Sequence, residues 1–162
     1  MQRIISGKSY VSQTSITRPA DVTAYAAGDV VGATLAAITF ADVGPDFGVV
    51  SIADADLRID VAAVPAGMTS FRLHLYNVAP PSALADNAAW DLPAGDRASY
   101  LGYIDLGSPV DVGATLFVQT TGVGAKTIQL KTSSVFGYLV TNGGFTPSSA
   151  AVKTIRLGLM GA

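Results

Sequence analysis

Residues 70–78, "SFRLHLYNV", show most clearly how this chain folds. Apolar side chains occupy every second position and polar or amphipathic ones lie between them, so that Phe71, Leu73 and Leu75 alternate with Arg72, His74 and Tyr76. A period of two is typical of a β-strand with one face against a core and the other toward solvent. We therefore expect a half-buried strand here, with His74 exposed or at an interface on the polar face.

Similar alternation extends in both directions from this stretch. The other candidate strands are residues 33–40, 48–53, 57–64, 98–107, 114–121, 125–132, 134–141 and 151–159. The glycine-containing segment "GVGAK" (122–126) is typical of a hairpin turn between two of them. About eight short strands separated by turn signals predict an all-β chain that folds as a single jelly-roll-like β-sandwich.

Two segments do not follow this pattern. Residues 79–97 have prolines near both ends, and we expect a long loop excursion that Trp90, the only tryptophan, pins to the body. Residues 1–21 alternate weakly, so we expect an extended N-terminal arm, with the sandwich domain spanning 22–162. An unpaired extended segment can add to the sheet edge of another subunit. The candidate interface residues of the arm are Arg3, Ile4, Ile5, Tyr10, Val11, Ile16 and Arg18.

The composition restricts the partners that the chain can have. Charged residues make up 14% of the 162 residues, against about 25% in typical globular proteins. The net charge is −2 and Lys and Arg do not cluster, so we expect no nucleic-acid partner. No stretch approaches the roughly 20 apolar residues of a membrane span, and the start "MQRIISGKSY" has no signal-peptide pattern, so we expect a chain made in the cytoplasm without a membrane partner. A low fraction of charged residues is typical of a subunit whose surface is covered in an assembly.

Catalytic and metal-binding candidates are few. His74 is the only histidine, and the chain has no cysteine and no glutamate, so we expect no enzyme activity and no cofactor. Asp54, Asp56 and Asp60 begin like a calcium-binding loop, but the glycine and the distal glutamate of such a loop are missing. We expect Asp54 and Asp56 to mark a turn and Asp60 to lie on an exposed strand face.

Carbohydrate chemistry is the remaining possibility. Asp86, Asp91 and Asp96 lie in the excursion and could include a carboxylate pair for glycoside hydrolysis, although capping roles in loops explain them equally well. Aromatic side chains could line a sugar-binding platform, although aromatics on strands are more often core or interface residues. The aromatic candidates are Tyr76, Trp90, Tyr100, Tyr103 and Tyr138.

Three segments of the sequence resemble those of a known group of proteins. They are "TRPADVTAYAAGDVVG" (17–32), "FRLHLYNVAPPSALADNAAWDLPAGDRASYLGYIDLG" (71–107) and "FGYLVTNGGFTPSSAAVKTIRLGL" (136–159). Together they resemble small structural proteins encoded by tailed bacteriophages and prophages, over most of the chain from Thr17 onward. These phrases consist of structural residues and contain no catalytic signature, so they indicate a group of proteins and not a mechanism.

The resemblance implies a virion component on the capsid surface, a decoration (cement) protein that binds the major capsid protein lattice and stabilises the head. A homotrimer is implied by the local threefold positions of such a lattice. The alternative is a carbohydrate-binding or fibre or tail structural module of a phage virion.

Overall fold

The structure is a computed structural model that describes residues 7–161, with the backbone alone for 121–125. It contains nine β-strands and one short 3-10 helix in this range. The elements are β1 (Ser9–Thr17), β2 (Ile38–Phe40), β3 (Val49–Ile59), β4 (Phe71–Tyr76), η1 (Ala94–Asp96), β5 (Tyr100–Leu106), β6 (Val110–Asp111), β7 (Leu116–Gln129), β8 (Val135–Thr141) and β9 (Val152–Gly161). No helix between residues 7 and 161 has the length and apolar character needed to cross a membrane.

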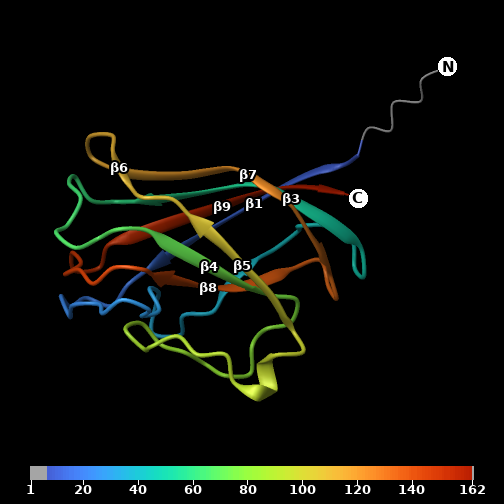
Figure 1. Cartoon of the computed structure of the whole chain (residues 1–162), viewed down its shortest axis with the longest axis horizontal. Coiled ribbons are helices and arrows are strands. Elements are labelled where there is room, and N and C mark those ends of the chain that lie inside the picture. Colours follow the sequence, from blue (N-terminus) through green and yellow to red (C-terminus); the bar gives the residue numbers. More distant parts are fainter. Residues whose placement is uncertain (1–6, 162) are drawn as a thin grey trace.

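The strands form two antiparallel sheets that face each other, as Figure 1 shows. One sheet has the order β1-β9-β3-β7-β6 and the other has the order β2-β8-β4-β5. Apart from the β4–β5 and β6–β7 pairs, every connection between consecutive strands crosses from one sheet to the other. This winding is the jelly-roll arrangement, in which two Greek keys close a sandwich. The predicted all-β, jelly-roll-like sandwich is therefore confirmed.

The main core lies between the two sheets and is built from the inward positions of alternating strands. Phe71, Leu73 and Leu75 of β4 are fully buried in it, as their spacing predicted. Burial of such side chains stabilises the fold by about 1.5–3 kcal/mol each. Their partners across the sandwich include Ile52, Leu57, Leu116, Val118, Ile155 and Leu157.

Two local predictions about the strands are wrong. Residues 122–126 do not turn the chain back, because β7 runs through them and pairs with β3 on both sides. Ile52 pairs with Lys126 and Asp54 pairs with Thr121, so four residues of β7 face Ala53 alone. The glycines of this segment therefore mark a bulge in one long strand. Glycine is common at bulges because it accommodates irregular backbone conformations. Likewise, residues 48–53 and 57–64 do not form two strands, because β3 continues from Val49 to Ile59.

The expectation of an N-terminal arm outside the sandwich is wrong for the part that the structure describes. Residues 9–17 form β1, which pairs antiparallel with β9 along its whole length, from Ser9–Met160 to Thr17–Val152. Its inward positions include the buried Ser12 and the partly buried Tyr10 and Ile16, which pack against the main core. Residues 1–6, and with them Arg3, Ile4 and Ile5, lie outside the described residues.

The long connection between β4 and β5 covers the outer face of the four-stranded sheet (Figure 1). Apart from η1 it has no regular element, and it packs on a second cluster of buried side chains. The hydroxyl of Tyr138 donates a hydrogen bond to the carbonyl oxygen of Ser82 at 2.7 Å and fixes one end of the segment. The buried members of this cluster are Val30, Ala36, Tyr76, Tyr138 and Val140, with Leu84, Trp90, Leu92, Tyr100 and Phe136 packed against them.

Candidate interaction surface

The two outer faces of the sandwich differ, because one is covered and the other is open. His74 lies on the covered face and is only 3% exposed, so the expectation that it would be exposed or at an interface is wrong. Its ring stacks on Trp90 with 3.7 Å between ring centroids, and its Nδ1 lies 2.9 Å from the Tyr100 hydroxyl. The alternation of residues 70–78 correctly gives the two faces of β4, but the polar face is covered by residues from the excursion.

His74 should remain neutral at physiological pH. Burial and the nearby positive charge of Arg72 lower its pKa from 6.5 to about 4. Because the pKa is lower in the folded state, this group has no effect on stability above pH 6.5 and destabilises the fold increasingly as the pH falls from 6.5 toward 4. We expect the imidazole resonances in an NMR titration to shift with a midpoint near 4. A midpoint near 6.5 in the folded protein would contradict the burial of this ring.

The aromatic side chains do not form an open sugar-binding platform. Tyr76 and Tyr138 are buried, and Trp90 and Tyr100 are partly buried beneath and within the excursion. Tyr103 is 46% exposed, and the guanidinium carbon of Arg72 lies 4.2 Å from the centre of its ring. Trp90 anchors the excursion as expected, although it is partly and not fully buried.

The open face belongs to the five-stranded sheet, and its charges are paired with each other. The Nε of Arg156 donates to Asp56 at 2.6 Å, and its NH2 group donates to Asp54 at 2.8 Å. Arg58 lies 3.6 Å from the other oxygen of Asp56. Asp54 and Asp56 therefore lie inside β3, where arginine side chains neutralise them, and they do not mark a turn. Asp60 is exposed just beyond the end of this strand. Among the described residues no group of three His, Cys, Asp or Glu side chains is placed to hold a metal ion.

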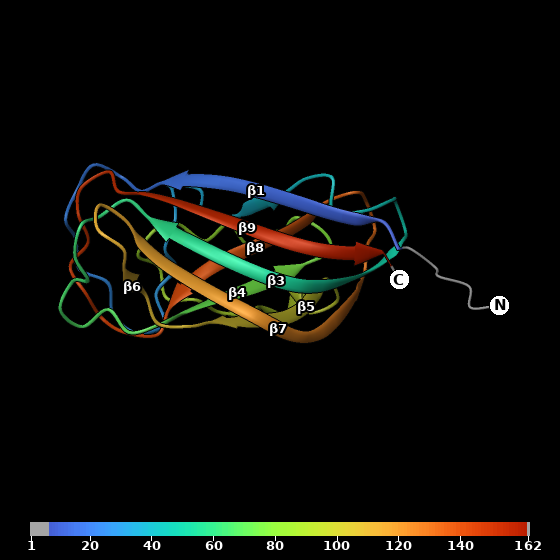
Figure 2. The same cartoon turned by 90° about the horizontal axis from the view of Figure 1, so that it is seen from above.

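The rest of this open face is weakly charged and partly apolar. Val11 of β1 is 64% exposed and Met160 of β9 is 51% exposed, with hydroxyl pairs such as Ser15–Thr154 between the strands. Val49 begins β3 and is also exposed. Ser51 of β3 pairs with Met160, so Val49 is a diagonal neighbour of Met160 on the same face. Figure 2 looks onto this sheet, with β1 at its margin.

Arg18 lies inside its own chain and is only 2% exposed. It donates hydrogen bonds to the Tyr25 hydroxyl at 3.2 Å, to the carboxylate and carbonyl oxygens of Asp21, and to Asp86 at 3.3 Å. Tyr25 and the backbone N–H of Gly32 also donate to Asp86, at 2.6 and 2.9 Å. This cluster joins the end of β1 to the excursion, so Arg18 presents no surface to a partner.

The three aspartates of the excursion have separate local roles. Asp86 belongs to the Arg18 cluster, whereas exposed Asp91 accepts a hydrogen bond from the backbone N–H of Leu92. Asp96 is 2% exposed in η1, where the backbone N–H of Ser99 donates to its carbonyl oxygen.

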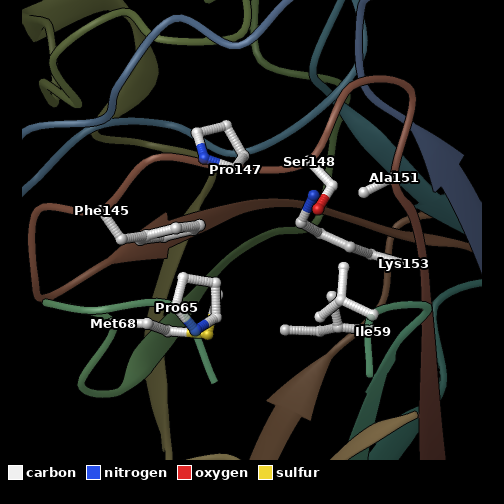
Figure 3. A pocket seen from close by; sticks show the side chains of 9 residues that line it. Ile59, Pro65, Met68, Phe145, Pro147, Ser148, Ala151 and Lys153 are labelled. Carbon is white, nitrogen blue, oxygen red and sulfur yellow. The ribbon is translucent and has the colours of Figure 1, made fainter. Parts of the chain in front are cut away.

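A buried lysine is the feature that the sequence interpretation did not single out. Lys153 of β9 is 2% exposed and lines a pocket between the β3–β4 and β8–β9 connections, with Ile59, Met68 and Phe145 beside it (Figure 3). No hydrogen bond or ion pair reaches its ammonium group from the described side chains. Burial lowers the pKa of Lys153 from 10.5 to about 8. The sequence nevertheless indicates this burial, because Lys153 shares the apolar face of residues 151–159 with Ile155 and Leu157.

Comparison with known proteins finds likeness at the level of structure. No protein-family model and no curated protein sequence matches the chain. It is similar to a capsid structure of Ralstonia phage GP4, with 14% identity, a TM-score of 0.47 and coverage of 100% of this chain and 90% of that one. It is also similar to the capsid asymmetric unit of cyanophage Pam1, with 14% identity, a TM-score of 0.37 and coverage of 99% and 89%.

A lipoprotein of Bacteroides thetaiotaomicron shows a comparable likeness. Its identity is 12%, its TM-score is 0.42, and the match covers 96% of this chain and 85% of that one. The identities and TM-scores of the two phage capsid structures and of the bacterial lipoprotein are thus similar. The jelly-roll assignment rests on the chain's own strand order.

Proposed function

We propose that this chain is a virion structural protein of a tailed phage, a decoration (cement) protein that binds the major capsid protein lattice. The sequence phrases at 17–32, 71–107 and 136–159 support this proposal through their resemblance to small phage structural proteins. The fold is compatible with it, because the jelly roll recurs in viral capsid proteins, although it also recurs in lectins and cupins.

The observation that carries the proposal is the open face of the five-stranded sheet. Its central charges neutralise each other through Arg156, Asp54 and Asp56, and exposed apolar side chains such as Val49 and Met160 lie beside them. Because the charged groups of this face are already paired, contact with another protein leaves none of them buried without a partner. The chain then acts by binding and not by turnover.

The mechanism of such a protein is the sum of many weak contacts. A subunit placed where capsomers meet buries surface on several shell proteins at once, and linked contacts strengthen one another through their high effective concentration. We propose a homotrimer, because a local threefold position of an icosahedral lattice offers three equivalent contacts. The shell then resists rupture better with this protein bound than without it.

The test is the binding of the purified protein to capsids that lack it. We expect wild-type protein to bind, and the double variant Val49→Asp/Met160→Asp to bind at least about tenfold more weakly, because two carboxylates would have to be desolvated. Leu35→Asp is the matched control, since Leu35 is a 74% exposed apolar residue outside the five-stranded sheet. Absence of binding by wild-type protein, together with binding to a glycan array, would support the carbohydrate-binding alternative and overturn the proposal.

A further inference from the structure

Strand β1 has one side without a partner. The N–H of Gly161 donates to the carbonyl oxygen of Lys8, and the N–H of Arg18 donates to the carbonyl oxygen of Ala151. In an antiparallel ladder such pairs alternate, so the even-numbered residues of β1 bond to β9. The backbone groups of the odd-numbered residues therefore point to the opposite side. Among the described residues nothing pairs with this free edge, whose donors and acceptors belong to Ser9, Val11, Gln13, Ser15 and Thr17.

The strand itself lacks the sequence features that usually protect an exposed edge. The nine residues of β1, "SYVSQTSIT", contain no charge, no proline and no glycine, and the ladder to β9 has no register shift. The other outermost strands are less available. β6 has two residues and β2 has three, while the ladder between β5 and β4 carries a bulge at Leu75/Tyr76. Long, regular and uncharged edges are the ones that pair with another chain.

We propose that the occupant of this edge is a second copy of the same chain, with the two β1 strands paired antiparallel about a twofold axis at Gln13. In this register residue 9 lies opposite residue 17 of the second copy, so the whole strand is used. The free N–H and C=O groups of the odd-numbered residues then meet each other as hydrogen-bonded pairs. The two five-stranded sheets become one continuous sheet across the axis.

The side chains of β1 are self-complementary in this register. On the inward face, Tyr10 lies opposite Ile16 of the second copy, and Ser12 lies opposite Thr14. An aromatic residue beside a β-branched one and two facing hydroxyl groups are among the favourable cross-strand pairs of antiparallel sheets. On the outer face Val11 lies opposite Ser15, and Gln13 lies opposite its own copy. No like charges are opposed within Ser9–Thr17, because this strand has no charges.

A second copy fits this edge better than a charged peptide from another protein. An acidic or basic strand would gain no ion pair from β1 and would lose hydration beside it. The isologous contact closes on itself, since pairing about a twofold axis uses both free β1 edges. It is separate from the contact that forms the proposed homotrimer, which uses another surface of the chain. This inference concerns the chain alone, so it stands or falls independently of binding to a capsid.

Single cysteines on β1 test both the pairing and its register. The chain has no cysteine of its own. In the proposed register the two Cα atoms of residue 13 are about 5.5 Å apart, which suits a disulfide. The two Cα atoms of residue 15 are offset by four positions along the strands, about 13 Å, which does not. We expect Gln13→Cys to form a covalent dimer rapidly under mild oxidation, and Ser15→Cys, the control on the same strand and face, to remain largely monomeric.

A proline variant tests the same edge without a covalent bond. The N–H of Gln13 points away from β9, so Gln13→Pro removes a donor from the free edge and leaves the β1–β9 ladder intact. In sedimentation equilibrium we expect wild type and Gln13→Ala to associate through this edge, and Gln13→Pro to associate at least about tenfold more weakly. Equal crosslinking at positions 13 and 15, no crosslinking in folded Gln13→Cys, or unchanged association of Gln13→Pro would each overturn the proposal.

Discussion

Replacing Asp86 with alanine should lower the free energy of unfolding by about 3–5 kcal/mol, because it removes one partner of a buried ion pair. The side chain of Arg18 is fully buried, and that of Asp86 is 6% exposed. The same carboxylate accepts hydrogen bonds from the Tyr25 hydroxyl and from the backbone N–H of Gly32. Without it, Arg18 keeps only the carbonyl and the half-exposed carboxylate of Asp21 and the hydroxyl of Tyr25 as partners.

Urea unfolding of wild type and Asp86→Ala would measure this loss. Asp91→Ala is the matched control, since Asp91 lies in the same excursion, is exposed, and bonds only to the neighbouring backbone N–H of Leu92. We expect the control to change stability by about 0.5 kcal/mol or less. If Asp86→Ala is as stable as the control, the excursion is not held to the end of β1 by this cluster.

The strands of this fold could be predicted where one face is apolar. In β4 the alternation of Phe71, Leu73 and Leu75 is enough to assign the strand and its core face. In β1 the inward positions include Ser12 and Thr14, which are polar, so its alternation is hidden although the strand is real. A period-two pattern of hydrophobicity therefore detects a strand only when the buried side chains are themselves apolar.

What covers a face could not be read from the same pattern. His74 and Tyr76 occupy the predicted outer positions of β4, yet both are buried. The residues that pack on them, such as Trp90 and Tyr100, come from other parts of the chain. The glycines of residues 122–126 show a similar limit. Glycine marks irregular backbone but does not say whether the chain reverses or bulges, and here the chain bulges opposite Ala53.

The candidate surfaces depend on these long-range contacts. The sequence predicts Arg18 to be an arm residue because it gives no sign of the two partners that bury it. Asp86 lies far along the chain, and nothing in the pattern around Tyr25 indicates a contact with Arg18. Val11 is exposed, and Tyr10 and Ile16 are half-buried at the sheet edge, so they remain candidates for the proposed pairing. The sequence thus proposes interface residues in this segment, whereas its position at the edge of a sheet follows from the ladder with β9.

Replacing Lys153 with methionine should raise the free energy of unfolding at pH 7 by about 3 kcal/mol, since each pKa unit corresponds to 1.36 kcal/mol. The pKa of Lys153 is lowered from 10.5 to about 8 by burial among Ile59, Met68 and Phe145. Below pH 8 the folded protein therefore holds a buried ammonium group that the unfolded chain exposes to water. Methionine has a similar length and no charge, and the surrounding apolar side chains can accommodate it.

The pH dependence separates this cause from a simple improvement in packing. Because the folded-state pKa of Lys153 lies below its unfolded value, its unfavourable contribution is full below pH 8 and disappears as the pH rises toward 10.5. The difference in the free energy of unfolding between Lys153→Met and wild type should therefore shrink between pH 8 and 10. The contributions of the other titrating groups are the same in both proteins and cancel in this difference. Lys131→Met, at an exposed lysine, should differ from wild type by about 0.5 kcal/mol or less. A stability gain that stays constant with pH would attribute the effect to packing, and a loss of stability would mean that the ammonium group is solvated or paired in the folded protein.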